Sequence, residues 1–362
     1  MEAQPEFSQV PLAQVGLGTV GLELIKLVKS WNESSNEGPK LRYIGLADSG
    51  GLAINKGGFS SQELEKIEEE KRAGGRLSNV SQTSLTELSD LESLFSDTER
   101  GVLIDVTDAE SLSQLYHRGF GCGWSVVVAN KIPLTSVTPE EFRKLTEGGI
   151  RYEATVGAGL PVISTLKHLQ RQGDGIEEIG AILSGSLSYI LSEIETGKDL
   201  SDAVLDAKQK GFTEPNPVED LIGNDVVRKG LILGRSLGME INIEDVDVSP
   251  LVPIPEKNSS GRKLKEQLVK FDSEFRSKAQ LAEEQGKRLR YLARVNEGGV
   301  KVGLESLDSK SQLAGGAGTS NVIQFKTENY TDPPLIIQGP GAGPGVTAGG
   351  VLSEINSLTR GY

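Results

Sequence analysis

The chain has 362 residues, 36% of them hydrophobic, and a formal net charge of −13. This length predicts two domains, and the negative charge argues against nucleic-acid binding, which relies on Lys and Arg at phosphates. The acidic N-terminus and the lack of an apolar run of ~18 residues predict a cytoplasmic protein without a membrane partner. One Cys and two His make an internal disulfide or a zinc site unexpected.

The chain begins with the pattern of a nucleotide-binding unit. Residues 12–15 predict a strand that runs into "GLGTVG" at 16–21, and apolar residues then recur at helical spacing. Glycines here permit a tight turn and let backbone N–H groups approach a pyrophosphate at the positive end of a helix. The motif therefore predicts dinucleotide binding; a structural glycine turn is the alternative.

A second predicted strand ends at Asp48, where a carboxylate can accept hydrogen bonds from ribose hydroxyls. The same charge repels a 2′-phosphate, so Asp48 favours NAD or dual use of both cofactors. Lys56 lies in the following loop and could pair with that phosphate instead, and an exposed turn aspartate is the plain alternative. Residues 61–72 predict a charged helix that lies mostly in water, and we assign it no function.

Further strands are predicted at "GVLIDVT" and "WSVVVANK", with a helix between them, so a doubly wound parallel sheet continues to about Ile150. Lys131 follows the second of these strands, at the edge where open α/β sheets bind ligands. A lysine in an exposed turn is the alternative. Cys122 has no histidine motif nearby, so we expect an incidental role rather than a nucleophile.

Beyond residue 152 strands and helices alternate less regularly, which predicts a mixed α+β domain. A helix over 222–238 has an apolar arc with Arg228 and Arg235 nearly opposite. Asp225 and Lys229, at i and i+4, fall at the edge of that arc. Such a pair is most often a surface ion pair, but at an apolar edge it would be partly desolvated and open to a ligand.

The connector before this helix carries further carboxylates. Pro215 and Pro217 stiffen the backbone that presents Glu214 and Asp220. Carboxylates fixed at a cleft suit a substrate that bears an ammonium group. For Glu219, a role in the site and a place in a rigid acidic loop in water are equally good interpretations.

Taken together, these motifs resemble the homoserine dehydrogenase family, in order and across nearly the whole chain. The motifs that carry the resemblance are "GLGTVG", "ANK", "YEATVGAGLPVI", "ILSGSLSYI", "GFTEPNPVEDLIGNDVVRK" and "GPGAGPGVTAGGV". The resemblance implies reversible NAD(P)-dependent interconversion of L-aspartate 4-semialdehyde and L-homoserine, which feeds threonine, methionine and isoleucine synthesis. It also implies a Rossmann-type domain at 1–152, joined by 339–362, and a substrate-binding, catalytic and dimerisation domain at 153–338.

The resemblance assigns roles residue by residue. Lys229 is similar to the family's proton donor and Lys131 to its second active-site lysine, beside the nicotinamide. Asp225 and Glu214 resemble residues that hold the substrate amino acid, and the connector adds Asp220 to this set. The residues predicted to bind the dinucleotide are Gly16, Gly18, Thr19, Val20, Gly21, Asp48, Thr107, Lys131 and Gly343.

A monovalent cation, usually Na⁺, is implied as well, bound through Glu153 and oxygens of Val156, Ala158 and Leu160. Asn216 and Glu219 stand where family members often carry aspartates, which weakens a role for Glu219. The chain stops just after its last predicted helix, so a regulatory extension is not expected. A homodimer through the sheet of the second domain is implied.

The mechanism implied is hydride transfer to the aldehyde carbon while protonated Lys229 delivers a proton to the oxygen. Two alternatives stay open. One is another NAD(P)-dependent dehydrogenase of a small amino or hydroxy acid, because the glycine turn does not define a substrate. The other is a dinucleotide-sensing protein without catalysis.

Overall fold

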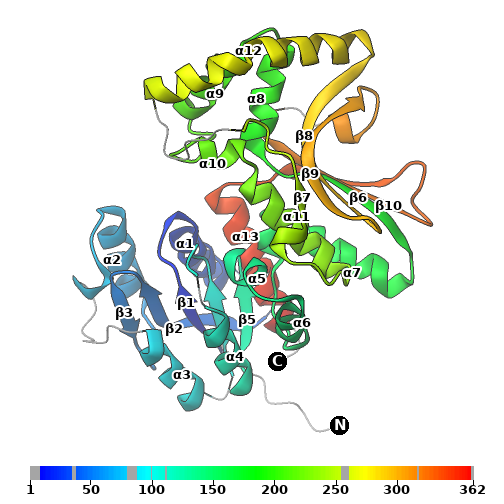
Figure 1. The fold of residues 1–362 in the computed structure, drawn as a ribbon. Helices are drawn as coiled ribbons and strands as arrows, with labels where there is room; N and C mark the ends of the chain where they lie inside the picture. The colour runs from blue at the N-terminus through cyan, green and yellow to red at the C-terminus, as the bar shows by residue number, and fades with distance from the viewer. Residues whose placement is uncertain are drawn as a thin grey trace. The chain divides into compact units, whose positions relative to one another are not determined.

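A computed structural model describes residues 9–34, 38–79, 88–98, 100–110, 112–253, 261–315 and 318–359 (Figure 1). The chain forms two compact units, Met1–Gly159 with Gly343–Tyr362, and Leu160–Ala342. The predicted boundaries, at 152 and 339, lie close to these. The roles predicted for the two domains stay predictions.

The first unit is built on a five-stranded sheet in the order β3-β2-β1-β4-β5. Its strands are β1 Gln9–Val15, β2 Lys40–Asp48, β3 Gly51–Ile54, β4 Val102–Asp105 and β5 Ser125–Val128. Strands β2, β1, β4 and β5 are parallel, as predicted. The edge strand β3 was not predicted, and it is antiparallel to β2 because a tight turn after Asp48 pairs that residue with Gly51.

Helices surround this sheet, and the last one comes from the C-terminal end of the chain. They are α1 Thr19–Ser34, α2 Ser61–Arg72, α3 Glu92–Asp97, α4 Ser113–Gly121, α5 Ile132–Thr135, α6 Pro139–Glu147 and α13 Pro344–Thr359. Helix α13, red in Figure 1, packs against α1 and contributes Ala348, Val351 and Ile355 to the core of the first unit.

Helix α2 coincides with the charged helix predicted at 61–72. A capping box at its start joins Ser60 and Glu63, which satisfies backbone N–H groups that the helix cannot pair internally. Only Leu64 and Ile67 are buried in it, so its remaining residues form a largely charged surface.

The second unit is a six-stranded sheet in the order β11-β10-β6-β8-β9-β7. Its strands are β6 Ile176–Ile182, β7 Asp247–Val248, β8 Lys287–Asn296, β9 Gly299–Asp308, β10 Ser320–Thr327 and β11 Leu335–Pro340. All neighbours are antiparallel except β7 and β9. The helices are α7 Val162–Gln172, α8 Gly185–Glu195, α9 Leu200–Gln209, α10 Val218–Leu221, α11 Asn224–Ser236 and α12 Gly261–Glu284. This confirms the mixed α+β prediction.

Helix α11 lies close to the sheet because small residues face it. A Cβ on Gly230 would meet Val300 at 3.1 Å and Ala293 at 3.3 Å. Arg235, which the helical projection places nearly opposite the apolar arc, is nevertheless only 5% exposed, and its Nε donates to the carbonyl of Ile241 at 3.0 Å. The loop that follows the helix folds back over it, which a helical projection does not include.

In the part of the chain that the structure describes, no helix has the length and apolar character to cross a membrane.

Candidate functional site

The glycine turn joins β1 to α1, and each glycine in it meets a different steric requirement. Gly16 has φ +107°, a left-handed conformation that side chains rarely adopt. A Cβ on Gly21 would lie 2.1 Å from the carbonyl oxygen of Gly16, whereas one on Gly18 would meet nothing within 4 Å. Gly16 and Gly21 therefore shape the turn, and Gly18 leaves open backbone in front of the α1 N-terminus. This arrangement fits a pyrophosphate.

The side chain of Gln14 stabilises the turn, and we did not identify this residue from the sequence. Its buried Nε2 donates to the carbonyls of Gly16 at 2.8 Å and Gly21 at 3.1 Å, and its Oε1 accepts from the Tyr43 hydroxyl at 2.8 Å. The signal was present as a polar residue inside a buried strand, which requires hydrogen-bond partners.

Asp48 ends β2, where it was predicted. Its Oδ1 accepts from the backbone N–H of Gly50 at 2.7 Å, and its Oδ2 lies 2.6 Å from Lys71 Nζ on α2. The second contact is an ion pair whose angles are not those of a hydrogen bond. Lys56, the predicted cation of this loop, pairs with Asp97 at 2.6 Å instead.

At the end of β4, the buried Asp105 joins the two loops that carry Thr107 and Lys131. Its Oδ1 accepts from the backbone N–H and hydroxyl of Thr107 at 2.9 and 2.7 Å, and its Oδ2 accepts from Asn130 at 3.0 Å and from Tyr116. Burial raises the pKa of the Asp105 carboxyl, although these hydrogen bonds oppose the shift.

Lys131 follows Asn130 directly and precedes α5. We did not identify Asp105 from the sequence, although it is a buried hydrogen-bond acceptor at the end of β4.

In the second unit, α11 places Lys229 and Asp225 together as predicted. Lys229 Nζ lies 2.6 Å from Asp225 Oδ2 and donates to the Leu183 carbonyl at 2.8 Å. The Lys229 side chain is 10% exposed and that of Asp225 is 50% exposed. The ammonium is therefore held in a buried position with one carboxylate and one carbonyl, and its partner still meets solvent.

The connector before α11 is tied to the start of α8. Asp220 Oδ1 accepts from the Ser186 hydroxyl at 2.6 Å, and Oδ2 accepts from the backbone N–H of Glu214 at 2.9 Å. Burial raises the pKa of Asp220, and the negative charge of Asp225 adds to the shift. Ser186 was missed as a site residue although it lies in a quoted motif. Glu214 is exposed.

Glu219, also exposed, accepts from the Asn224 amide at 3.3 Å.

The loop predicted to bind a cation contains two residues with positive φ, Gly157 at +85° and Ala158 at +57°. Such a conformation is unusual for alanine and turns successive carbonyls in different directions. The backbone N–H of Glu153 donates to Glu354 of α13 at 3.0 Å. Gly343 begins the segment that enters α13, with φ +125°. Val156 is buried and Leu160 is partly exposed.

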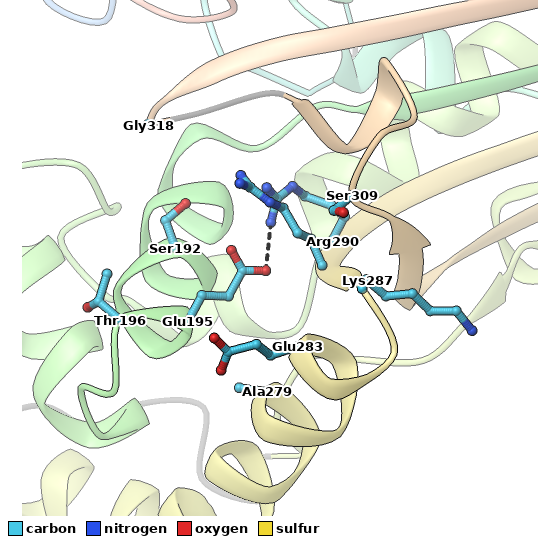
Figure 2. A pocket seen from close by; sticks show the side chains of 11 residues that line it. Ser192, Glu195, Thr196, Ala279, Glu283, Lys287, Arg290, Ser309 and Gly318 are labelled. Carbon is cyan, nitrogen blue, oxygen red and sulfur yellow. Dashed lines mark hydrogen bonds and ion pairs between the residues drawn. The ribbon is translucent and has the colours of Figure 1, made fainter.

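The second unit also has a pocket of about 490 Å³ between α8, α12 and β8 (Figure 2). Side chains of both charges line the pocket: Glu195 and Glu283 are acidic, and Lys287 and Arg290 are basic. The buried Arg290 pairs with Glu195 at 3.1 Å and donates to the Ala314 carbonyl at 2.8 Å. None of the predicted site residues lies in this pocket. These contacts join α8, β8 and the turn after β9, so Arg290 has a structural role.

The fold thus belongs to the class in which a Rossmann-type unit with an open glycine turn is combined with an α+β unit. Here the α+β unit carries a buried lysine paired with one carboxylate. The model of the homoserine dehydrogenase family matches residues 161–355, and the chain belongs to this family. The predicted family and fold class are confirmed.

Relatives extend this match over nearly the whole chain. A Schizosaccharomyces pombe homoserine dehydrogenase is 34% identical over 362 residues, which cover 96% of this chain and 95% of the relative. A bifunctional aspartokinase/homoserine dehydrogenase of Haemophilus influenzae is 35% identical over 96% of this chain. This chain spans 42% of that protein and a similar share of several bifunctional relatives from plants.

Among solved structures, a hyperthermophilic archaeal homoserine dehydrogenase in complex with NADPH superposes with a TM-score of 0.76. Its sequence is 26% identical, and the match covers 98% of both chains.

Proposed function

We propose that this chain catalyses the reversible NAD(P)-dependent reduction of L-aspartate 4-semialdehyde to L-homoserine. One observation carries the proposal. In a chain of this family, the Lys229 ammonium is held between Asp225 and the Leu183 carbonyl, beside the connector that presents Glu214 and Asp220. A buried lysine next to carboxylates suits proton delivery to a substrate that carries its own ammonium group.

When bound, the reduced nicotinamide supplies the hydride that adds to the aldehyde carbon. Lys229 gives a proton to the carbonyl oxygen as it becomes a hydroxyl, so hydride and proton together make the alcohol. In the oxidative direction Lys229 accepts the proton of the hydroxyl. Oxidation of the alcohol releases a proton overall, so higher pH favours homoserine oxidation. Asp225 positions the lysine, and Glu214, Asp220 and Asp225 attract the amino group of the substrate.

On the cofactor side, the open backbone at Gly18 supports binding of the pyrophosphate at the start of α1. Thr19, Val20, Thr107 and Gly343 complete the proposed lining, and Lys131 is proposed to act beside the nicotinamide. These assignments rest on the motif and on the family. The archaeal relative solved with NADPH supports a nicotinamide cofactor of this kind.

A monovalent cation, Na⁺ by resemblance, is proposed at the carboxylate of Glu153 and the oxygens of Val156, Ala158 and Leu160. The positive φ of Ala158 supports a loop shaped to present carbonyls. We also propose a cytoplasmic homodimer that serves threonine, methionine and isoleucine synthesis. The half-buried Leu307 and Ile336 beside the small core on one face of the second sheet support pairing through that sheet.

The direct test mixes the purified protein with L-homoserine and either NAD or NADP and follows the absorbance of the reduced cofactor. Turnover that depends on homoserine supports the proposal. Turnover only with another small amino or hydroxy acid would identify a different dehydrogenase. Cofactor binding without turnover on any substrate of such a panel would favour a sensing protein.

A further inference from the structure

Helix α8 contacts several of the groups around Lys229, and it packs against both α9 and α10 (Figure 1). The Leu183 carbonyl, just before α8, accepts from Lys229. In the first turn of the helix, the Ser186 hydroxyl donates to Asp220. Tyr189 follows Ser186 by three residues, and residues at this spacing are neighbours on one side of a helix. Tyr189 is thus placed beside a residue that already contacts the proposed site.

The ring of Tyr189 contacts the start of the connector that carries Glu214. Its centroid lies 5.0 Å from that of Phe212, and the two planes meet at 67°, close to the edge-to-face arrangement that aromatic pairs prefer. Phe212 is 42% exposed, so the core does not hold its ring in place. The contact with Tyr189 therefore anchors the chain two residues before Glu214.

Polar contacts hold the other end of the Tyr189 side chain. Its hydroxyl donates to Asp206 Oδ2 at 2.5 Å and accepts from Lys210 Nζ at 2.5 Å. Hydrogen bonds with the Tyr189 hydroxyl and Asp206 raise the pKa of the Lys210 ammonium, which keeps it charged at neutral pH. Lys210 directly follows α9, and Gly211 then turns the chain into the connector with φ +72°. Tyr189 is therefore fixed at the point where the connector begins.

The connector is attached to α8 on both sides of Glu214. On one side, Phe212 contacts Tyr189. On the other, Asp220 accepts from Ser186 and from the Glu214 N–H at 2.9 Å. We propose that Tyr189 is a positioning residue, which sets the place of the Glu214 carboxylate and thereby the affinity for the ammonium group of the substrate. This inference rests on the proposed function and deepens it.

The test is steady-state kinetics of homoserine oxidation with the whole chain, together with titration with NADPH. We expect Tyr189→Leu to raise KM for L-homoserine about three- to tenfold, the range that an aromatic pair contributes. The kcat and the Kd for NADPH should change less than about twofold, because Lys229 and the glycine turn are untouched. Tyr189→Phe keeps the ring contact and loses the hydroxyl, so its KM should lie between those of the wild type and Tyr189→Leu.

Hydrogen exchange measures the connector directly. In Tyr189→Leu, the backbone N–H groups of residues 211–214 should exchange faster than in the wild type, because the anchor that limits local opening is lost. The N–H groups of α11 should keep their protection. A change confined to the connector would not follow from general destabilisation, which would affect both segments.

Two control variants keep the test specific. Tyr330→Leu removes another tyrosine of the second unit, 38% exposed in the turn after β10. Lys198→Met removes a cation that contacts Asp206 at 2.8 Å from the turn before α9. Both variants should leave KM unchanged.

An unchanged KM in Tyr189→Leu would overturn the inference. So would a joint loss of kcat, NADPH affinity and protection throughout the unit, since that pattern describes a residue needed only for folding. If the wild type oxidises no homoserine, the proposed function itself fails. The exchange experiment then still supports or overturns the anchoring of the connector by Tyr189, so the two failures are distinguishable.

Discussion

The glycine turn of the first unit and the acidic segment of the second are both site candidates, but different forces shape them. In the turn, Gly16 and Gly21 are required by backbone geometry, since a Cβ on Gly21 would lie 2.1 Å from a carbonyl oxygen. Around α11, Lys229 and Asp220 are held by charge and hydrogen bonds to distant segments. The turn is thus fixed by steric exclusion and the acidic segment by electrostatics.

The difference teaches how each region should respond to change. A steric requirement tolerates almost no substitution and affects folding directly. An electrostatic arrangement tolerates shape-conserving substitutions and responds to charge and pH. Mutations in the two regions should therefore separate stability from activity.

The largest effect is expected in the acidic segment, on activity alone. Lys229→Met removes the proposed proton donor while it conserves the length of the side chain, and it should lower kcat for homoserine by about 10²- to 10⁴-fold, the usual contribution of general acid–base catalysis. NADPH binding and Tm should change little. Steady-state kinetics and a binding titration measure both, with Lys310→Ala, an exposed lysine in the turn after β9, as the control. Near-normal turnover with the cofactor bound would contradict the role of Lys229.

In the glycine turn we expect one glycine to affect stability and the other to affect cofactor binding. Gly21→Ala forces the turn to open and should reduce the free energy of unfolding by about 3 kcal/mol, as overpacking of a tight contact does. Gly18→Ala meets no atom within 4 Å and should leave stability nearly unchanged while it weakens cofactor binding. Urea denaturation and titration with NADPH distinguish the two. Equal stability losses would show that the turn is not sterically determined.

Gln14 combines both kinds of force, so its replacement should have an intermediate effect. Gln14→Leu leaves two carbonyls of the turn and the Tyr43 hydroxyl without their partner. The expected loss in free energy of unfolding is about 2 kcal/mol, typical of buried groups left unsatisfied. Tyr43→Phe removes only one of these contacts and should cost about 1 kcal/mol. A smaller loss for Gln14→Leu than for Tyr43→Phe would argue against this network.

The smallest effect concerns Asp220 and pH. Burial raises its pKa in the folded chain, so its contribution to stability is complete below the pKa of the unfolded chain and is lost as pH rises through the raised value. Asp220→Asn has no charge to bury. Relative to the wild type, the variant should therefore become more stable as pH increases from the acid range to neutral. Denaturation at several pH values measures this difference; a constant difference would refute the raised pKa.

Much of the fold was predictable from local pattern. The βαβ start, the charged helix α2 and the helix that carries Asp225 and Lys229 all lie where the sequence indicates. The antiparallel edge strand β3 and the burial of Arg235 were not predicted. Both depend on how a loop folds back over its neighbour, which no periodicity records.

The sequence by itself determined the glycine turn and the spacing of Asp225 and Lys229, because φ angles and helical period are properties of neighbouring residues. Only the tertiary structure decided which charges meet. Asp48 pairs with Lys71 rather than Lys56, Asp105 connects the loops of Thr107 and Lys131, and Asp220 accepts from Ser186. Electrostatic energy depends on distance and burial in the folded chain, and neither quantity is encoded in the order of residues alone.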